Sequence, residues 1–324
     1  MNKPNMRPSI KNSTILVTGG AGFIGSHLVD KLMDVGAKQL IVVDNMFLGS
    51  EQNLQKAISN GAIFYKDDIE IKSSLEYLFE KHEIDIVFNC ATKALNYSFV
   101  NPQNAFDTNV NGILNLLELQ RKSAFKTLVH FSTSEVYGTA VYEPMDEKHP
   151  INPTTTYAAG KAAADMALKS YVSMFDLDAF IVRPFNNYGP RQNYKGYLAG
   201  IIPITAWRIL NGISPEIHGT GEQSRDFIYV FDTVDAIVKL YDILKAGESV
   251  NISTDGQIKI KDLVTQIAVM MEYDGIIEKK ESRKSDVECH IADNSKIKSL
   301  IDYRLTSFEK GLQETLEWYK ANII

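Results

Sequence analysis

Residues 14–25 read Thr14-Ile15-Leu16-Val17-Thr18-Gly19-Gly20-Ala21-Gly22-Phe23-Ile24-Gly25. The first five residues form a short apolar run, which predicts a buried strand. Glycines then recur at every third position, and residues 26–32 have the apolar spacing of a helix. Glycine permits a tight turn, lets backbone N–H groups reach a pyrophosphate and lets a helix pack on a strand. The stretch therefore predicts a strand, loop and helix that bind a dinucleotide.

A second apolar run, Leu40-Ile41-Val42-Val43, ends at Asp44. An acidic residue about 20 positions after such a glycine loop binds the ribose diol of a dinucleotide. Its carboxylate would also repel a 2′-phosphate, so the sequence predicts NAD rather than NADP. Two later residues follow expected strands, and each has two interpretations. Asp68 either meets the adenine amine or lies in a solvated turn, and Lys93 either binds a cofactor phosphate or is exposed.

Strand and helix patterns alternate up to residue 183. Further strands are expected at 62–65, 85–89, 127–131 and 179–183, and helices at 51–59, 72–82, 102–122 and from Tyr157. This alternation predicts an α/β fold, a Rossmann-type doubly wound parallel sheet. Alternation is lost after Pro184, which predicts a smaller C-terminal α+β substrate lobe. We therefore expect an NAD-binding domain at 1–184, with a return around 226–250 through a helix at 232–245, and a nucleotide-sugar lobe at 185–324.

Composition excludes several classes of protein. The 324 residues are enough for a large domain and a smaller lobe. A net charge of −6 argues against a nucleic-acid or anionic membrane partner. The two cysteines, Cys90 and Cys289, show no disulfide or metal spacing, which favours a reducing cytoplasm. The histidines show no metal spacing either, and no uncharged apolar run reaches the ~20 residues of a membrane span.

A candidate proton shuttle lies at Tyr157 and Lys161. Residues four positions apart share one face of a helix. A free phenol has a pKa of about 10 and is a poor base at neutral pH, but a nearby cation lowers that pKa. Tyr157 is therefore a candidate base and Lys161 the group that tunes it. Alanine and glycine surround the pair, so a flat group could approach it closely.

These motifs together resemble those of the extended short-chain dehydrogenase/reductase family that acts on nucleotide sugars. The resemblance covers nearly the whole chain and rests on Gly19 to Gly25, Asp44, Thr133, Val136-Tyr137-Gly138, Tyr157, Lys161, Arg183-Pro184-Phe185-Asn186 and Gln223-Ser224-Arg225-Asp226-Phe227. It implies an NAD-dependent enzyme in which Thr133, Tyr157 and Lys161 form a catalytic triad.

The resemblance also implies the ligand contacts. Bound NAD would contact Gly19, Gly22, Phe23, Ile24, Gly25, Asp44, Asn45, Asp68, Ile69, Ala91, Lys93, Asn109, Tyr157 and Lys161. Asn186 and Arg225 would hold the diphosphate of a nucleoside-diphosphate sugar, since the arginine fork meets phosphate oxygens bidentately. Arg191 is a third candidate for substrate binding. Family members are usually homodimers that pair the helices of Asn109 and Tyr157 in a four-helix bundle.

Glu135, two residues after the triad threonine Thr133, is the residue that helps to distinguish the reactions of this family. By resemblance, Tyr157 takes the O4 proton as the C4 hydride moves to NAD, which gives a 4-keto sugar. Glu135 could then act as base at C5 and as acid for the departing C6 hydroxyl, as a 4,6-dehydratase requires. Ser134 stands where many dehydratases carry aspartate, and it is a further catalytic candidate. The order of preference is 4,6-dehydratase, UDP-uronate decarboxylase, then 4-epimerase; an NAD-binding scaffold is the alternative without activity.

Overall fold

The computed structural model describes residues 7–281 and 291–323, which form two compact units. Unit 1 contains the described residues up to Thr133, together with Thr155–Arg183 and Val234–Val250. Unit 2 contains Ser134–Thr154, Pro184–Thr233 and the described residues from Asn251 onward. Residues 134–154, which the sequence analysis placed in the first domain, therefore belong to unit 2.

A seven-stranded sheet has the strand order β11-β6-β5-β4-β1-β2-β3. Its strands are β1 (Thr14–Thr18), β2 (Gln39–Asp44), β3 (Ile63–Lys66), β4 (Ile86–Asn89), β5 (Thr127–Phe131), β6 (Asp178–Pro184) and β11 (Ser249–Ile252). β1 pairs in parallel with β2 on one side and β4 on the other, so the strand order reverses there. Ligands of open α/β sheets bind at such a reversal. The expected doubly wound parallel sheet is confirmed.

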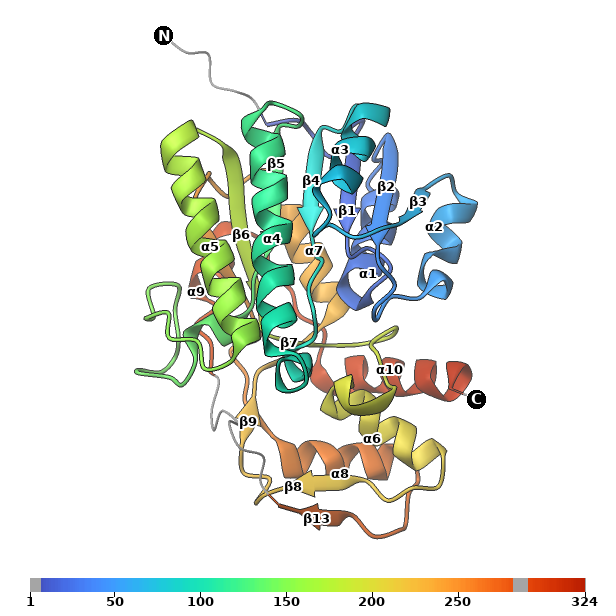
Figure 1. Ribbon diagram of the computed structural model, residues 1–324. Coiled ribbons are helices and arrows are strands. Elements are labelled where there is room, and N and C mark those ends of the chain that lie inside the picture. Colours follow the sequence, from blue (N-terminus) through green and yellow to red (C-terminus); the bar gives the residue numbers. More distant parts are fainter. Residues whose placement is uncertain (1–6, 282–290, 324) are drawn as a thin grey trace. The chain divides into compact units, whose positions relative to one another are not determined.

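Helices cover this sheet, as Figure 1 shows. They are α1 (Phe23–Asp34), α2 (Gln55–Ser59), α3 (Lys72–Lys81), α4 (Pro102–Arg121), α5 (Thr156–Phe175) and α7 (Val230–Leu240), with 3₁₀ turns η1 (Glu51–Leu54) and η2 (Leu95–Phe99). A core beneath α3, α4 and α5 contains Leu16, Ile41, Val87, Leu128 and Ile181 from the sheet, all fully buried. Strands buried by helices read as continuous apolar runs, which is why the sequence located them.

Unit 2 combines short strands and helices, as expected for an α+β lobe. Its described residues form three strand pairs: β7 (Asn186–Tyr188) with β10 (Phe227–Tyr229), β9 (Ser224–Arg225) with β12 (Ile258–Lys259), and β8 (Glu216–His218) with β13 (Glu278–Lys280). The helical elements are η3 (Ser134–Tyr137), η4 (Gly196–Leu198), α6 (Ile201–Leu210), α8 (Ile260–Met270), α9 (Ser295–Leu300) and α10 (Phe308–Asn322). Its core is partly aromatic and includes Tyr188, Phe227, Tyr229 and Tyr319.

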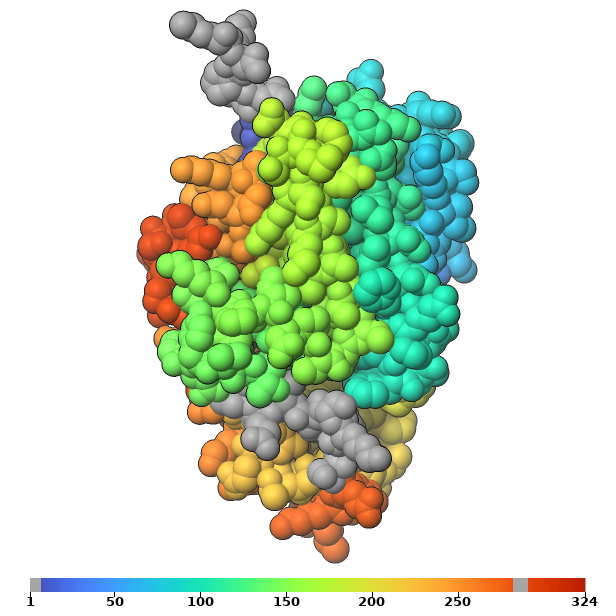
Figure 2. All heavy atoms as spheres, turned by 60° about the vertical axis from the view of Figure 1, so that its left-hand side comes forward, coloured from blue at the N-terminus to red at the C-terminus, as the bar shows by residue number. Residues whose placement is uncertain are grey.

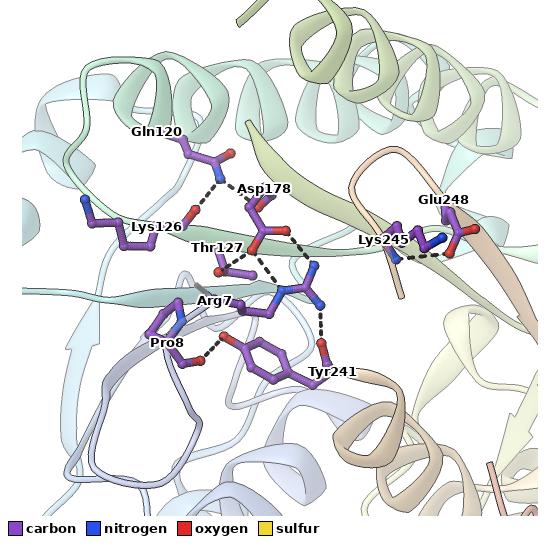
Figure 3. Close-up of polar contacts among 9 residues, drawn as sticks. All are labelled: Arg7, Pro8, Gln120, Lys126, Thr127, Asp178, Tyr241, Lys245 and Glu248. Carbon is purple, nitrogen blue, oxygen red and sulfur yellow. Dashed lines mark hydrogen bonds and ion pairs between the residues drawn. The ribbon is translucent and has the colours of Figure 1, made fainter. Parts of the chain in front are cut away.

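Arg7 fixes the start of the described chain to the sheet of unit 1 (Figure 3). Its guanidinium donates hydrogen bonds to both carboxylate oxygens of Asp178, at 2.8 and 2.5 Å, and one to the carbonyl of Tyr241. The guanidinium carbon also lies 4.7 Å from the centre of the Phe180 ring. Charge-assisted bonds and a cation–π contact therefore attach this segment to β6, at the end of the sheet opposite the glycine loop.

Candidate active site

The glycine loop leaves the N-terminus of α1 available to an anion. Gly22 is the N-cap of α1, and among the described residues no side chain caps this end. The first N–H groups of a helix have no partner within the helix and bind phosphates readily. A Cβ placed on Gly22 would meet only the Gly19 carbonyl oxygen among the described residues, at 3.1 Å. The loop therefore has room for a pyrophosphate beside Gly22, Phe23 and Ile24.

The other two loop glycines are required by the fold itself. Gly19 has φ +65°, and a Cβ there would come within 2.7 Å of the backbone of Ala91. A Cβ on Gly25 would overlap the Gly19 carbonyl oxygen. The loop thus holds its shape through close backbone contacts, and Ala91 takes part through its backbone.

We expect Gly22→Ala and Gly25→Ala to separate these two roles. Gly25→Ala should lower the free energy of unfolding by about 1–3 kcal/mol, because the methyl group overpacks the loop. Gly22→Ala should cost less stability than Gly25→Ala, because its Cβ contact of 3.1 Å is the looser one, but it should weaken NAD binding roughly tenfold or more, since the methyl group occupies the phosphate position. Chemical denaturation and calorimetric titration with NAD measure the two effects. Unchanged NAD affinity in Gly22→Ala would place the pyrophosphate elsewhere.

Asp44 ends β2 and anchors the loop. Its carboxylate accepts hydrogen bonds from the backbone N–H groups of Ala21 at 3.0 Å and Met46 at 2.8 Å. Burial raises the pKa of this carboxyl, and those N–H donors oppose the rise. Next to it, the Asn45 amide donates to the Asp68 carboxylate at 2.7 Å. The structure thus brings Asp44, Asn45 and Asp68 together beside the glycine loop, where a ribose and adenine would lie.

Two further cofactor candidates are buried. The Ile69 side chain packs in the core, where a Cβ on Gly112 would overlap its Cδ1, so only its backbone is available to a ligand. Lys93 is 6% exposed, and its Nζ lies 4.2 Å from the centre of the Phe47 ring. Of the two interpretations of Lys93, the exposed one therefore does not hold.

Tyr157 is placed by its backbone contacts. The Tyr157 N–H donates to the Ser98 hydroxyl at 3.0 Å, and its carbonyl accepts from the Asn109 amide at 3.3 Å. The side-chain amide oxygen of Asn109 accepts from the Thr92 hydroxyl at 2.8 Å. Asn109, expected at the cofactor, thus links the loop after β4 to the first turn of α5. Thr155 caps that helix by accepting from the Ala158 N–H.

The small residues around Tyr157 let α5 lie close to α4. A Cβ on Gly160 would approach the Phe106 carbonyl oxygen to 3.0 Å and the Asn109 Cβ to 3.2 Å. Ala158, Ala162 and Ala164 are also buried. The sequence analysis expected these residues to admit a flat ligand, but at Gly160 the neighbour is a helix.

Lys161 lies one helical turn after Tyr157 and is 1% exposed. Its ammonium donates a hydrogen bond of 2.7 Å to the carbonyl of Phe131, the last residue of β5. Burial lowers the pKa of Lys161 to about 8, although Asp165 acts in the opposite direction. A cation is thus held at the carboxyl end of the sheet, on the same helix face as the phenol.

Thr133 is buried and ends unit 1, and the η3 turn begins unit 2. Within η3, Ser134, Val136 and Tyr137 are buried, whereas Glu135 is half-buried. The Tyr137 hydroxyl donates to the Asn251 amide oxygen at 2.7 Å, which fixes the turn within unit 2. Across residues 131–138, all of which the structure describes, Glu135 is the one side chain that is not buried.

Unit 2 brings two of the expected substrate residues close together. Asn186 is opposite Phe227 in the β7–β10 pair, and its amide donates to the Asp226 carbonyl at 3.4 Å. Arg225 directly precedes Asp226, whose buried carboxylate accepts hydrogen bonds from the backbone of Thr254. Burial raises the pKa of Asp226 to about 6.

Arg191, the third expected substrate residue, is half-buried in the loop after β7. Its φ of 67° is left-handed, a conformation that a residue with a side chain seldom adopts. It follows Asn186 of β7 by five residues along the chain.

Comparison with known proteins identifies the family. A family model described as GDP-mannose 4,6 dehydratase matches residues 16–315. The chain belongs to the extended short-chain dehydrogenase/reductase family of nucleotide-sugar enzymes. This family member is 33% identical to UDP-glucuronic acid decarboxylase 6 of Arabidopsis thaliana, over 90% of the chain and 84% of that protein. Two solved structures extend the comparison.

UDP-glucose 4-epimerase of Thermotoga maritima, solved with UDP-glucose, matches this family member with a TM-score of 0.90 and 34% identity, over 96% of this chain and 100% of that chain. dTDP-glucose 4,6-dehydratase of Streptomyces venezuelae, solved with NAD bound, matches with a TM-score of 0.89 and 30% identity, over 95% of this chain and 97% of that chain. The relatives thus include epimerases, decarboxylases and dehydratases. NAD is the cofactor of this family, and the open helix terminus with Asp44 fits it.

Three observations on the described residues concern metals, membranes and cysteines. No group of three or more histidine, cysteine, aspartate or glutamate side chains there could hold a metal ion. No helix in the same part of the chain has the length and apolar character that crossing a membrane requires. Cys90 is a free cysteine, and Cys289 lies outside the described residues.

Sequence reasoning missed several residues that shape the site. Ser98 and Thr92 hold the Tyr157 helix, and no local pattern marks them. Asp165 and Arg183 form a buried pair near Lys161, with 2.9 Å between Arg183 Nη2 and Asp165 Oδ2. A signal existed for Asp165, because it lies four residues after Lys161 and therefore on the same helix face.

Proposed function

We propose that this chain is a nucleotide-sugar 4,6-dehydratase that converts its substrate into a 4-keto-6-deoxy sugar nucleotide. The half-buried Glu135, two residues after Thr133, supports this choice most strongly. A dehydratase needs a side chain that removes the C5 proton and then protonates the leaving C6 hydroxyl. A 4-epimerase needs no acid at this position. The other three side chains of the η3 turn are buried, and Glu135 is its half-buried residue.

The residues of the chain then have defined tasks. Tyr157 accepts the proton of the sugar O4, and Lys161 keeps that phenol acidic. Thr133 holds the same oxygen by a hydrogen bond. Bound NAD supplies reversible hydride acceptance. Once C4 is a carbonyl, the C5 hydrogen is acidic, and Glu135 transfers it as a proton to the departing C6 hydroxyl, which leaves as water and creates a C5–C6 double bond. Return of the hydride to C6 and of one proton to C5, which balances the proton taken from O4, gives the 4-keto-6-deoxy product.

Unit 2 supplies the groups for the nucleotide. Arg225 and Arg191 offer planar donor forks, and Asn186 offers an amide, all suited to diphosphate oxygens. The buried Asp226, pinned by the 254–255 turn, holds the backbone between Arg225 and β10 in place. We infer that substrate affinity resides largely in this segment.

Two other reactions start from the same C4 oxidation. The match to the Thermotoga maritima epimerase, at 34% identity, favours 4-epimerisation as the second candidate. The match to the Arabidopsis thaliana enzyme favours C4-oxidising decarboxylation of a UDP-uronate as the third.

Substrate profiling distinguishes these reactions directly. The protein is incubated with UDP-glucose, UDP-N-acetylglucosamine, UDP-glucuronate, GDP-mannose and dTDP-glucose, and the products are weighed by mass spectrometry. Loss of water supports the dehydratase. Loss of CO₂ from UDP-glucuronate, or an unchanged mass with altered stereochemistry, overturns it in favour of the other two reactions. Without any product, the scaffold interpretation replaces all three.

Glu135→Gln provides the residue-level prediction. We expect dehydration to fall by about 10²–10⁴-fold, because the amide neither accepts the C5 proton nor donates it to the hydroxyl. C4 oxidation should continue and appear as absorbance of reduced cofactor without water loss. Glu143→Gln, an exposed substitution in the same unit, is the control and should keep full activity. Normal dehydration by Glu135→Gln would move the acid–base role to another residue.

We also propose that the chain forms a homodimer through the outer faces of α4 and α5, which lie side by side in Figure 2. Large apolar side chains are exposed on α5, namely Met166, Met174 and Phe175, and before α4, namely Phe99 at the end of η2 and Val100 directly after it. Pairing two copies through these helices would remove such side chains from water, which favours association. We expect light scattering to give twice the chain mass; a monomer at micromolar concentration would contradict the pairing.

A further inference from the structure

Asp165 extends the helix face that carries the two expected catalytic residues. Tyr157, Lys161 and Asp165 are spaced four residues apart on α5, so their side chains lie in one row. Lys161 and Asp165 are each 1% exposed. A carboxylate this deeply buried is uncommon unless it is paired, and its partners show what it does.

One carboxylate oxygen of Asp165 receives three hydrogen bonds. Its Oδ2 accepts from the Ser132 hydroxyl at 2.9 Å and from Arg183 Nε and Nη2 at 3.1 and 2.9 Å. Ser132 directly follows β5, and Arg183 lies on β6 and is 1% exposed. Burial raises the pKa of the Asp165 carboxyl, whereas the Arg183 and Ser132 donors oppose that rise and fix the group against the sheet.

The charges around Lys161 do not balance without Asp165. Lys161 and Arg183 are two buried cations, and Asp165 is the carboxylate that faces them. His130, on β5, is held neutral, since burial and the two cations lower its pKa. Cys90, after β4, is a neutral thiol because burial raises its pKa. Removing Asp165 would leave two cations buried together without a compensating charge, which is strongly unfavourable.

Hydrogen bonds run from the residue before the glycine loop as far as His130, whose ring faces this carboxylate without a hydrogen bond to it. Thr18, the residue before Gly19, donates to the Asn89 amide oxygen at 2.6 Å. The Asn89 amide nitrogen then donates to His130 Nδ1 at 3.2 Å, so the neutral ring carries its hydrogen on Nε2. That Nε2 lies 3.8 Å from Asp165 Oδ1, and within the described residues neither atom has a hydrogen-bond partner.

We propose that Asp165 is a positioning residue whose charge keeps the buried Lys161 protonated and in place to act on Tyr157. Arg183 and Ser132 donate to Asp165 Oδ2, and the Lys161 ammonium donates to the Phe131 carbonyl. Asp165 therefore acts on Lys161 through its charge. One positive charge remains after Asp165 and Arg183 compensate each other. That surplus is available to a phenolate one turn away. The inference rests on the proposed function for its catalytic consequence.

A purely architectural role makes a different prediction. If the Asp165–Arg183 pair only joins α5 to β6, its loss lowers stability but leaves the pH dependence of the enzyme unchanged. If Asp165 sustains the charge of Lys161, its loss makes Lys161 give up its proton at lower pH. Charge removal and destabilisation can therefore be separated by measuring pH profiles.

The test is Asp165→Asn, with Asp165→Glu as the variant that keeps the charge. We expect the alkaline limb of kcat/KM, which reports deprotonation of Lys161, to move down by about one pH unit or more in Asp165→Asn. Asp165→Glu should keep the limb near its original pH. Gln120→Ala is the stability control, because it removes a buried amide that bonds the carbonyls of Lys126 and Asp178, as Figure 3 shows. It should not move the limb.

A second measurement separates this inference from the proposed function. NADH binding, followed by cofactor fluorescence from pH 6 to 10, requires no sugar substrate. As pH rises, binding of the anionic dinucleotide weakens when Lys161 loses its proton. In Asp165→Asn this weakening should begin at a lower pH than in the unchanged protein. If no sugar turns over but this shift occurs, the proposed function fails and the inference stands. If turnover and binding both keep their pH profiles in Asp165→Asn, the inference is overturned.

Ser132→Ala covers the case in which Asp165→Asn does not fold. It removes one of the three bonds that stabilise the ionised carboxylate, so it should move the same limb in the same direction by a smaller amount. A limb that stays in place in Ser132→Ala would then overturn the inference.

Discussion

Tyr157→Phe is expected to lower kcat by about 10²–10⁴-fold while the protein keeps its fold and its affinity for NAD. The substitution removes only the hydroxyl and keeps the two hydrogen bonds that the Tyr157 backbone makes. Ser98 accepts from the Tyr157 N–H and Asn109 donates to the Tyr157 carbonyl in either variant. The loss therefore falls on proton transfer from O4, the step that the phenol is proposed to perform.

Tyr171→Phe on the same helix provides the matched control. Its hydroxyl donates to Glu118 at 2.7 Å, so both variants lose one phenol on α5. We expect Tyr171→Phe to keep its activity, because Glu118 is partnered by Arg121 at 2.8 Å and lies outside the proposed site. Steady-state kinetics and NAD titration measure both variants. Full activity of Tyr157→Phe would remove Tyr157 from the role of base.

The sequence signals for the cofactor half of the proposed site are local. The glycines, Asp44 and the Tyr157–Lys161 spacing each constrain the backbone within a few residues. The element bounds followed from hydrophobic runs for the same reason, and β5 was predicted at the residues it occupies. One expected element differs slightly: the helix expected at 51–59 begins as the 3₁₀ turn Glu51–Leu54.

What the sequence did not predict depends on contacts between distant residues. The assignment of residues 134–154 to unit 2 depends on bonds such as Tyr137 to Asn251, which no local pattern announces. Ile69 follows a strand end like a ligand residue, yet its side chain fills the space that Gly112 leaves. Lys93 is covered by Phe47, so its burial is a tertiary effect.

Lys161→Met is expected to raise stability while it removes activity. Burial lowers the pKa of Lys161 to about 8, against 10.5 for a free lysine. Linkage converts a difference of this size into about 3 kcal/mol of cost for keeping the ammonium charged in the folded protein. The substitution leaves Asp165 and Arg183 as a compensated pair, so no unpaired charge is created. After the lost bond to the Phe131 carbonyl is subtracted, we expect a net gain of about 1–3 kcal/mol near pH 7.

The pH dependence of this gain tests its cause. Lys161 binds fewer protons in the folded than in the unfolded chain between about pH 8 and 10.5, so the stability of the unchanged protein rises through that window. The gain from Lys161→Met is therefore full below pH 8 and shrinks towards pH 10.5. Urea denaturation at several pH values measures it, with the exposed Lys169→Met on the same helix as control. A variant that is less stable than the unchanged protein near pH 7, or a gain independent of pH, would show that the buried ammonium is not under electrostatic strain; the tuning of Tyr157 by Lys161 would then need another explanation.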